Sequence, residues 1–290
     1  MNFDIQIKNL SLQFGNFYAL KDVSLALTDD KIYGLIGRNG AGKTSLLSLI
    51  TSFREPSSGT LEISGQNPFE NAPLMEHVNF IYDFDQSDEY ENVKSIMQIS
   101  ERYRPTFSME YAEQLIKKFK LPVDKPVKSL SKGMKSAMNV TIGLASRSPI
   151  TIFDEAYLGM DAPTREIFYQ ELLEDQARHP RKIILSTHLV SEMEYLFDEV
   201  IIIDRGKLLC HESYDQFINR GSTVTGAASS VDSFVKGMKV LHEQQLGPTK
   251  SVMVYGELTD NLLRLAEISG LEISPVSLQN LFIHMTKEDE

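Results

Sequence analysis

The chain has 290 residues, of which 42% are hydrophobic, so it is long enough for one large α/β domain and a small appendage. A net charge of −11, without any block rich in lysine or arginine, gives little electrostatic support for nucleic acid or another polyanion as a partner. The sequence has no long apolar run, no signal-peptide pattern and a single cysteine, so we expect neither a membrane span nor an internal disulfide.

The N-terminal part of the chain alternates apolar and polar side chains. Residues Phe3 to Phe14 fit a half-buried edge strand, and Val23, Leu25 and Leu27 fit a second strand. The next strand, Lys31 to Ile36, is apolar over most of its length, as expected of a strand that is buried on both faces. We therefore expect an antiparallel β lobe ahead of a buried strand.

The segment Gly37 to Thr44 reads Gly-Arg-Asn-Gly-Ala-Gly-Lys-Thr and fits G-x-x-x-x-G-K-[ST] at every fixed position. Glycine backbones can turn successive N–H groups toward a polyphosphate, and the apolar helix that follows adds its positive N-terminal end. Lys43 can follow the β- and γ-phosphates, and the Thr44 hydroxyl can bind Mg²⁺. The alternative, a glycine-rich turn with a chance lysine, does not explain both flanks. The expected nucleotide ligands are Gly37, Arg38, Asn39, Gly40, Ala41, Gly42, Lys43, Thr44 and Ser45.

Beyond the loop, strand and helix patterns alternate. Val78 to Tyr82 fits a short apolar strand, and from Asn92 to Lys120 apolar residues recur at helical spacing. Ser131 is a candidate N-cap for a further helix. We therefore expect a helical insert over about residues 90–145.

Two later strands end in polar residues. The strand Pro149 to Glu155 is apolar until it reaches its final carboxylates, Asp154 and Glu155, while Lys182 to Ser186 repeats the strand pattern and is followed by His188. Because the carboxyl ends of parallel strands meet at one edge of a sheet, we expect these polar side chains beside the phosphate loop. The alternation predicts a doubly wound, mostly parallel sheet.

The composition changes toward the C-terminus. Residues 221–223 and 226–230 are rich in small side chains and indicate loops, and a second, short α/β pattern includes a strand at Ser251 to Tyr255. We therefore expect a first domain over residues 1–220 and a C-terminal α/β appendage over residues 222–290.

Four separated pieces now occur in one order: the phosphate loop, Leu130–Met134, Ile152–Glu155 and Ser186–His188. With these pieces, about residues 3–220 closely resemble the ATPase subunit of an ABC transporter. The resemblance implies ATP and Mg²⁺ as cofactors and ATP hydrolysis as the reaction. It also implies an α/β fold, a P-loop ATP-binding cassette with an antiparallel β lobe, a doubly wound core and a helical insert.

The resemblance implies a role for each polar residue. Asp154 would orient Mg²⁺, Glu155 would polarise the attacking water, and His188 would contact the γ-phosphate. Ser131 and Gly133 match the family signature, which binds ATP held by a second cassette, so a homodimer or heterodimer would complete the site. The plainer interpretations are a strand-end cap for the carboxylates, a structural histidine and an ordinary helix cap.

Several positions depart from the family pattern. The glutamine expected after the strand Val78–Tyr82 aligns with Asp83, which can still bind Mg²⁺ and is a candidate metal ligand. The loop after the two carboxylates lacks the usual proline, although Asp161 falls at the position of the family aspartate. In the signature, Lys132 and Met134 replace glycine and glutamine.

An aromatic residue near the first turn would stack on adenine in this family. We choose Phe14 over Phe17 and Tyr18 because it directly precedes Gly15. A position in the hydrophobic core is the alternative for Phe14.

The resemblance implies a subunit that dimerises on ATP and powers export through a separate membrane-spanning subunit, with no nucleic-acid partner. It would be cytoplasmic and peripheral, held at the inner face of the cell membrane by that subunit. The signature and the segment Ser277–Ile283 are similar to those of a Gram-positive exporter branch, which suggests amphipathic peptides or an antimicrobial compound as cargo.

Two other functions remain as alternatives. A soluble P-loop ATPase acting on nucleic acid or the ribosome would be expected to carry two cassettes or a long coiled-coil insert, and neither pattern is present. A regulatory cassette would bind ATP without turnover, and Glu155 and His188 argue against that.

Overall fold

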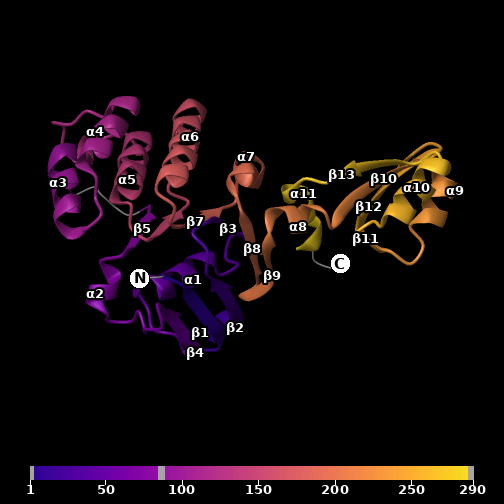
Figure 1. Cartoon of the computed structure of the whole chain (residues 1–290), viewed down its shortest axis with the longest axis horizontal. Helices are drawn as coiled ribbons and strands as arrows, with labels where there is room; N and C mark the ends of the chain where they lie inside the picture. The colour runs from indigo at the N-terminus through magenta and orange to yellow at the C-terminus, as the bar shows by residue number, and fades with distance from the viewer. Residues whose placement is uncertain (1–2, 84–88, 287–290) are drawn as a thin grey trace. The chain divides into compact units, whose positions relative to one another are not determined.

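The computed structural model describes residues 3–83 and 89–286, and it divides the chain into two compact units (Figure 1). The first unit comprises residues 1–188 and 195–211, and the second comprises residues 189–194 and 212–290. Apart from the short segment 189–194, the second unit runs from Glu212. The domain boundary expected between residues 220 and 222 stays a prediction. Among the described residues, no helix has both the length and the apolar character needed to cross a bilayer.

The first unit opens with a small antiparallel sheet in the order β2-β1-β4. Its strands are β1 (Ile5–Phe14), β2 (Phe17–Leu27) and β4 (Ser58–Ile63). Ile7 pairs with Leu25 on one neighbour and with Leu61 on the other, so the apolar residues of the alternating pattern share one face. That face contributes to the main hydrophobic core.

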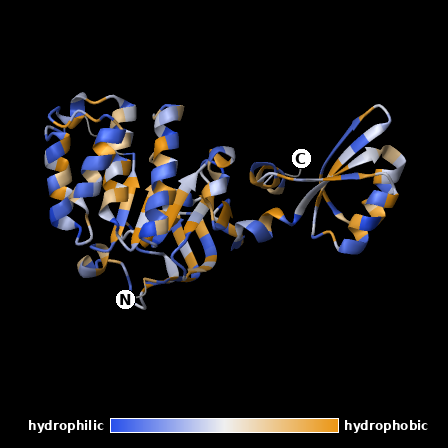
Figure 2. Cartoon of the chain, turned by 45° about the horizontal axis from the view of Figure 1, so that its top comes forward, coloured by the Kyte–Doolittle hydropathy of each residue, from blue (hydrophilic) through white to orange (hydrophobic). Residues whose placement is uncertain are grey.

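A six-stranded sheet forms the centre of the first unit, in the order β5-β6-β7-β3-β8-β9. The first five of these pair in parallel, which the sequence predicts for most of them. Figure 2 shows hydrophobic residues gathered on these strands. Their bounds are β3 (Ile32–Ile36), β5 (Val78–Tyr82), β6 (Ile150–Asp154), β7 (Lys182–Thr187), β8 (Glu199–Asp204) and β9 (Lys207–Ser213).

Helices cover both faces of this sheet. Helix α1 (Lys43–Ile50) shares a single core with the antiparallel sheet and the parallel strands, and α5 (Lys132–Ser146) packs on β5 and β6. The remaining helices of the unit are α2 (Ala72–Met75), α3 (Val93–Tyr103), α4 (Met109–Lys118), the 3₁₀ turn Val127–Ser129 and α6 (Ala162–Arg178).

Side-chain caps fix where α3, α4, α5 and α6 begin. Asn92, Ser108, Ser131 and Asp161 each accept a hydrogen bond from a backbone N–H in the first turn of the following helix. Such caps satisfy N–H groups that have no partner within the helix, and each contributes about 1 kcal/mol. Ser131 is therefore an N-cap, as its sequence context indicates.

The second unit follows the order β-α-β-β-α-β with a sheet order of β11-β12-β10-β13, in which all neighbours are antiparallel. This is the ferredoxin-like, split βαβ arrangement. Its elements are α7 (Val190–Met193), α8 (Tyr214–Ile218), β10 (Gly221–Ala227), α9 (Ala228–Phe234), β11 (Lys239–Leu246), β12 (Thr249–Tyr255), α10 (Asp260–Ile268), β13 (Glu272–Pro275) and α11 (Leu278–Met285). The 3₁₀ turn Glu194–Leu196 follows α7, and its last two residues belong to the first unit.

The prediction of loops at residues 221–223 and 226–230 is wrong. The first is the start of β10, a central strand, and the second spans the end of β10 and the start of α9. Gly221 is glycine because a Cβ there would lie 2.5 Å from Leu281 Cδ2 of α11. Its small size reflects close packing under a helix, which the sequence pattern alone does not distinguish from a loop.

Candidate active site

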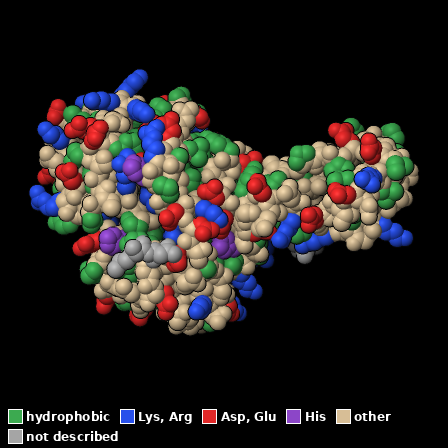
Figure 3. All heavy atoms as spheres, in the orientation of Figure 1, with side chains coloured by type: hydrophobic (Ala, Val, Ile, Leu, Met, Phe, Trp, Pro, Cys, Tyr) green, Lys and Arg blue, Asp and Glu red, His purple; other side chains and the backbone are tan. Residues whose placement is uncertain are grey.

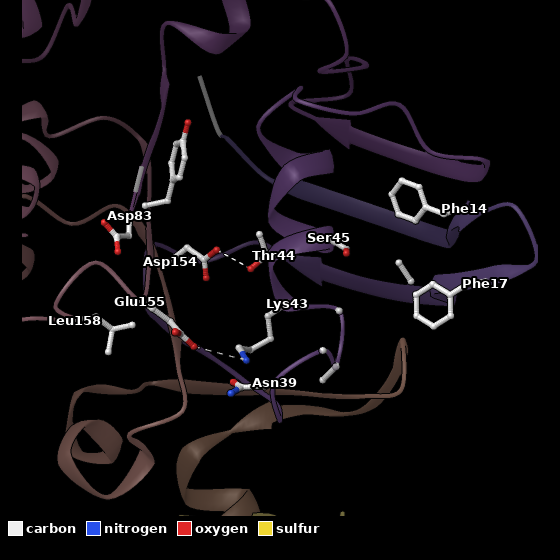
Figure 4. A pocket seen from close by; sticks show the side chains of 15 residues that line it. Phe14, Phe17, Asn39, Lys43, Thr44, Ser45, Asp83, Asp154, Glu155 and Leu158 are labelled. Carbon is white, nitrogen blue, oxygen red and sulfur yellow. Dashed lines mark hydrogen bonds and ion pairs between the residues drawn. The ribbon is translucent and has the colours of Figure 1, made fainter. Parts of the chain in front are cut away.

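The phosphate loop opens into a cavity of about 680 Å³ at the carboxyl edge of the parallel sheet (Figure 4). Three parts of the first unit line it: the loop and the start of α1, the ends of β5 and β6, and the turn between β1 and β2. The lining residues are Phe14, Phe17, Ala19, Asn39, Gly40, Ala41, Gly42, Lys43, Thr44, Ser45, Tyr82, Asp83, Asp154, Glu155 and Leu158.

The loop conformation depends on glycine. Gly42 has φ 111°, a left-handed conformation that L side chains avoid, and a Cβ there would lie 2.7 Å from the carbonyl oxygen of Ala19. Lys43 Nζ donates to the carbonyl oxygen of Gly37 at 2.8 Å. Gly37 and Arg38 do not line the cavity, so the loop presents its face from Asn39 onward.

Lys43 is the cation that faces the cavity from the loop, and it is 6% exposed. Burial lowers the pKa of its ammonium group, while the carboxylates of Glu155 and Asp154 act in the opposite direction. Its Nζ lies 3.9 Å from Glu155 Oε1, and Figure 4 shows the two side chains pointing toward each other. A polyphosphate at this position would meet a desolvated positive charge.

Thr44 and Asp154 lie next to each other although they are far apart in sequence. Thr44 Oγ1 donates a hydrogen bond of 2.8 Å to Asp154 Oδ2. Asp154 ends β6 and Thr44 lies in the first turn of α1, so the sheet edge and the helix bring them together. This pair of oxygens has the hard-ligand chemistry that Mg²⁺ prefers. Among the described residues, no three His, Cys, Asp or Glu side chains are grouped so that they could hold a metal ion.

Glu155 and His188 form a second pair at the same edge. His188 Nδ1 lies 2.9 Å from Glu155 Oε1, and Glu155 N–H donates to the carbonyl oxygen of Ser186 at 3.2 Å. Glu155 has φ 50°, a left-handed conformation that costs about 1–2 kcal/mol for a residue other than glycine. Such strain persists only where neighbouring contacts hold it, and it is common at active sites.

His188 pairs with Glu155 but does not itself line the cavity. The predicted ligands Ser131 and Gly133 lie away from the cavity. Ser131 is exposed and Gly133 half-buried, and neither lines it. Ser131 Oγ accepts a hydrogen bond from the backbone N–H of Met134 at 3.3 Å, and its position at the start of α5 leaves it outside the site of its own chain.

Asp161 also lies outside the cavity, where it caps α6. Its Oδ1 accepts a hydrogen bond from the backbone N–H of Thr164 at 3.0 Å. Hydrogen bonds from Thr164 lower the pKa of the Asp161 carboxyl group below its usual value.

Asp83 does line the cavity, directly after β5. Its Oδ2 lies 3.4 Å from Lys132 Nζ, and both side chains are more than half exposed. Two of the residues that depart from the family pattern thus form an ion pair with each other.

Two aromatic side chains stand across the cavity from the carboxylates (Figure 4). Phe14 is 45% exposed and Phe17 is 64% exposed, so Phe14 is not a core residue. The guanidinium carbon of Arg54 lies 5.0 Å from the centre of the Phe14 ring. Phe17, Ala19, Tyr82 and Leu158 also line the cavity without having been predicted; for Tyr82 the available signal was its place at the end of β5.

The sequence profile of the family described as ABC transporter matches residues 20–158. The chain is 29% identical over 206 residues to the ABC transporter ATP-binding protein YtrB of Bacillus subtilis (strain 168), covering 70% of each chain. It is also 29% identical over 224 residues to the Nod factor export ATP-binding protein I of Cupriavidus metallidurans, covering 74% of each. Among solved structures, an ATP-binding subunit of an ABC transporter superposes with a TM-score of 0.66 at 23% identity, covering 73% of this chain and 91% of that one. The fold class that the sequence predicts is confirmed.

Proposed function

The chain belongs to the ABC transporter family as an ATP-hydrolysing, ATP-binding cassette, and from this premise we propose that it powers export through a separate membrane-spanning subunit. The observation that carries the proposal is the constellation at the sheet edge: Lys43, Thr44 and Asp154 at the phosphate loop, with Glu155 and His188 beside them. Phosphate-binding, metal-binding and proton-accepting groups are thereby gathered around one cavity.

Lys43 and the loop hold the polyphosphate in this proposal. The Lys43 ammonium group exchanges its carbonyl partners for phosphate oxygens, and the backbone N–H groups of the loop add further donors. Thr44 and Asp154 would hold Mg²⁺, because their oxygens are already within 2.8 Å of each other. The ion, when bound, neutralises charge on the β- and γ-phosphates.

Glu155 is the proton acceptor for the attacking water. Its carboxylate lies between Lys43 Nζ and His188 Nδ1, at 3.9 Å and 2.9 Å, so it is held at the end of the loop where the terminal phosphate would lie. A positioned general base contributes about 10²–10⁴ in rate. His188 orients that carboxylate and offers a ring nitrogen toward the terminal phosphate.

A second cassette completes the site. Ser131 and Gly133 lie at the start of α5, with Ser131 exposed and Gly133 half-buried, and both lie outside the cavity of their own chain. The N-terminus of a helix favours phosphate, so the signature of a second cassette would bind the exposed side of the nucleotide. Both homodimers and heterodimers satisfy this requirement.

A groove of about 290 Å³ beside β5 is the proposed docking site for a cytoplasmic segment of the membrane subunit. It lies among β5, α3 and α5, and exposed Ile99 and Tyr103 give it an apolar wall. Tyr82 lines both this groove and the nucleotide cavity, which places the docking segment next to the site of hydrolysis. On the face seen in Figure 3, acidic and basic side chains are interspersed over the first unit, which favours this partner over nucleic acid.

The experiment that tests the proposal is co-expression with candidate membrane proteins, followed by purification in detergent and measurement of phosphate release. We expect a stable complex whose ATPase activity depends on Glu155. Recovery of the chain without any membrane protein, together with stimulation by RNA or ribosomes, would favour the soluble alternative. Amphipathic peptides or an antimicrobial compound remain the cargo we propose, to be tested as stimulators of the complex.

A further inference from the structure

We infer that Tyr157 is a positioning residue that holds the Glu155–His188 pair in its hydrolytic geometry. This inference rests on the proposed function. Tyr157 lies two residues after Glu155, in the turn that leads to α6, and its side chain is 1% exposed. Its hydroxyl group is hydrogen-bonded to Thr187 Oγ1 at 2.5 Å. Thr187 is fully buried and directly precedes His188.

Two separate links therefore join the turn that carries Glu155 to the end of β7, which carries His188. The first is the backbone hydrogen bond from Glu155 N–H to the carbonyl oxygen of Ser186, at 3.2 Å. The second is the Tyr157–Thr187 hydrogen bond, which is shorter and completely shielded from water. A buried hydrogen bond of this kind is costly to break, because both hydroxyl groups would lose a partner without gaining water.

The backbone of Glu155 explains why the second link is needed. Its φ of 50° is unfavourable, so the turn relaxes unless other contacts hold it. Relaxation would move the Glu155 carboxylate away from His188 Nδ1, which lies only 2.9 Å from it in this structure. Tyr157 opposes that movement without touching nucleotide, since it does not line the cavity.

The same turn is also hydrogen-bonded to α5, the helix that begins at the signature residues. Ser136 of α5 donates a hydrogen bond of 2.6 Å from its Oγ to the carbonyl oxygen of Leu158, the residue next to Tyr157. A displacement of α5, which begins at the signature, is therefore passed to the turn and through Tyr157 to the end of β7. Tyr157 thus couples a movement of α5, which begins at the signature residues, to the Glu155–His188 pair.

The matched test replaces Tyr157 with phenylalanine, which removes only the hydroxyl group. We expect kcat for ATP hydrolysis to fall about three- to tenfold, because losing one buried hydrogen bond lets the Glu155–His188 pair leave its hydrolytic geometry and so raises the activation free energy. The KM for ATP should stay within twofold of wild type, since Tyr157 does not face the nucleotide. Thr187→Val should have the same effect, and Thr187→Ser, which keeps the hydroxyl group, should retain near-normal kcat.

Additivity gives a second readout. Because both substitutions remove the same hydrogen bond, the Tyr157→Phe/Thr187→Val double variant should lose no more activity than either single variant. Tyr111→Phe is the control: its buried hydroxyl group is hydrogen-bonded to Glu171 Oε2 at 3.3 Å, outside the site. Tyr111→Phe should lower the thermal unfolding midpoint by about as much as Tyr157→Phe does, but it should leave kcat unchanged.

A kcat for both Tyr157→Phe and Thr187→Val that matches the Tyr111→Phe control would overturn the inference, as would fully additive losses in the double variant. An equal change in KM and kcat would also overturn it. Glu155→Gln, measured in parallel, separates the two proposals. If Glu155→Gln hydrolyses ATP at the wild-type rate, the proposed function fails; if it is inactive while Tyr157→Phe is fully active, only the role of Tyr157 fails.

Discussion

Replacing Lys43 with alanine tests the phosphate site most directly. Lys43 Nζ already donates to two backbone carbonyls, Gly37 O at 2.8 Å and Arg38 O at 3.4 Å, and it is almost completely buried. Removing the side chain therefore takes away a desolvated charge that no neighbouring cation of the loop can replace, since Arg38 does not face the cavity.

The size of the effect follows from the exchange of partners. A hydrogen bond to a charged group contributes about 1.5–3 kcal/mol, so two bonds to a polyphosphate would be worth about 3–6 kcal/mol. The carbonyl contacts that Lys43 gives up offset part of that gain. We therefore expect the lower end, a loss of about 10²-fold in ATP affinity, with hydrolysis nearly abolished.

Isothermal titration calorimetry with ATP and Mg²⁺ measures the affinity, and phosphate release measures turnover. Lys31→Ala is the matched control, because Lys31 directly precedes β3, at the end of that strand away from the phosphate loop, and forms ion pairs with Asp29 and Glu199. It should cost stability and leave ATP affinity unchanged. An affinity of Lys43→Ala within threefold of wild type would refute the assignment of Lys43 to the phosphates.

Three further predictions concern the rest of the site and the second unit. Glu155→Gln should bind ATP normally but hydrolyse it about 10²–10⁴ times more slowly, because an amide cannot accept the proton. Size-exclusion chromatography with ATP and Mg²⁺ should then show a stable dimer, whereas a monomer that binds ATP would contradict a site shared between two cassettes. Asp83→Gln should keep the hydrolysis rate within about fivefold of wild type, because an exposed ion pair such as Asp83–Lys132 contributes at most about 1 kcal/mol. A loss of activity as large as that of Glu155→Gln would show that Asp83 is an essential metal ligand. A chain ending after Arg220 should still bind ATP, because every lining residue precedes that point, but it should unfold at lower temperature because Glu194, directly after α7, loses the hydrogen bond that Leu278 N–H donates to its Oε2. A folded product that cannot bind ATP would show that the site depends on the second unit.

The phosphate loop and the carboxylates could be placed from the sequence because their geometry is set by local rules. A glycine-rich turn between a strand and a helix has few conformations, and parallel strands align their carboxyl ends. Asp154 pairs in register with Ser186, so the residues that follow each strand, Glu155 and His188, meet at the edge without any further information.

Contacts between side chains could not be placed in this way. The hydrogen bond of Tyr157 to Thr187 and that of Ser136 to Leu158 join segments whose sequences carry no shared signal. Each depends on how closely a turn packs against a neighbouring strand or helix, and hydroxyl groups form such bonds in many contexts. For the same reason the sequence favours Phe14 because of the glycine beside it, whereas the structure places Phe17 on the same cavity.

The second unit shows where composition misleads. Gly, Ser and Thr in residues 221–227 have the composition of a loop, yet this segment is β10, hydrogen-bonded along its length to β12 and also paired with β13. Small residues are required there because neighbouring side chains pack closely on the strand: Leu281 of α11 lies over Gly221, and Leu271, in the connection between α10 and β13, lies over Gly226. The apolar signal of the strand is reduced to Val224, which is fully buried between Val252 and Ile273. A strand that contributes one large side chain to its core and leaves the rest of the packing to its neighbours has a pattern that hydrophobic periodicity cannot detect.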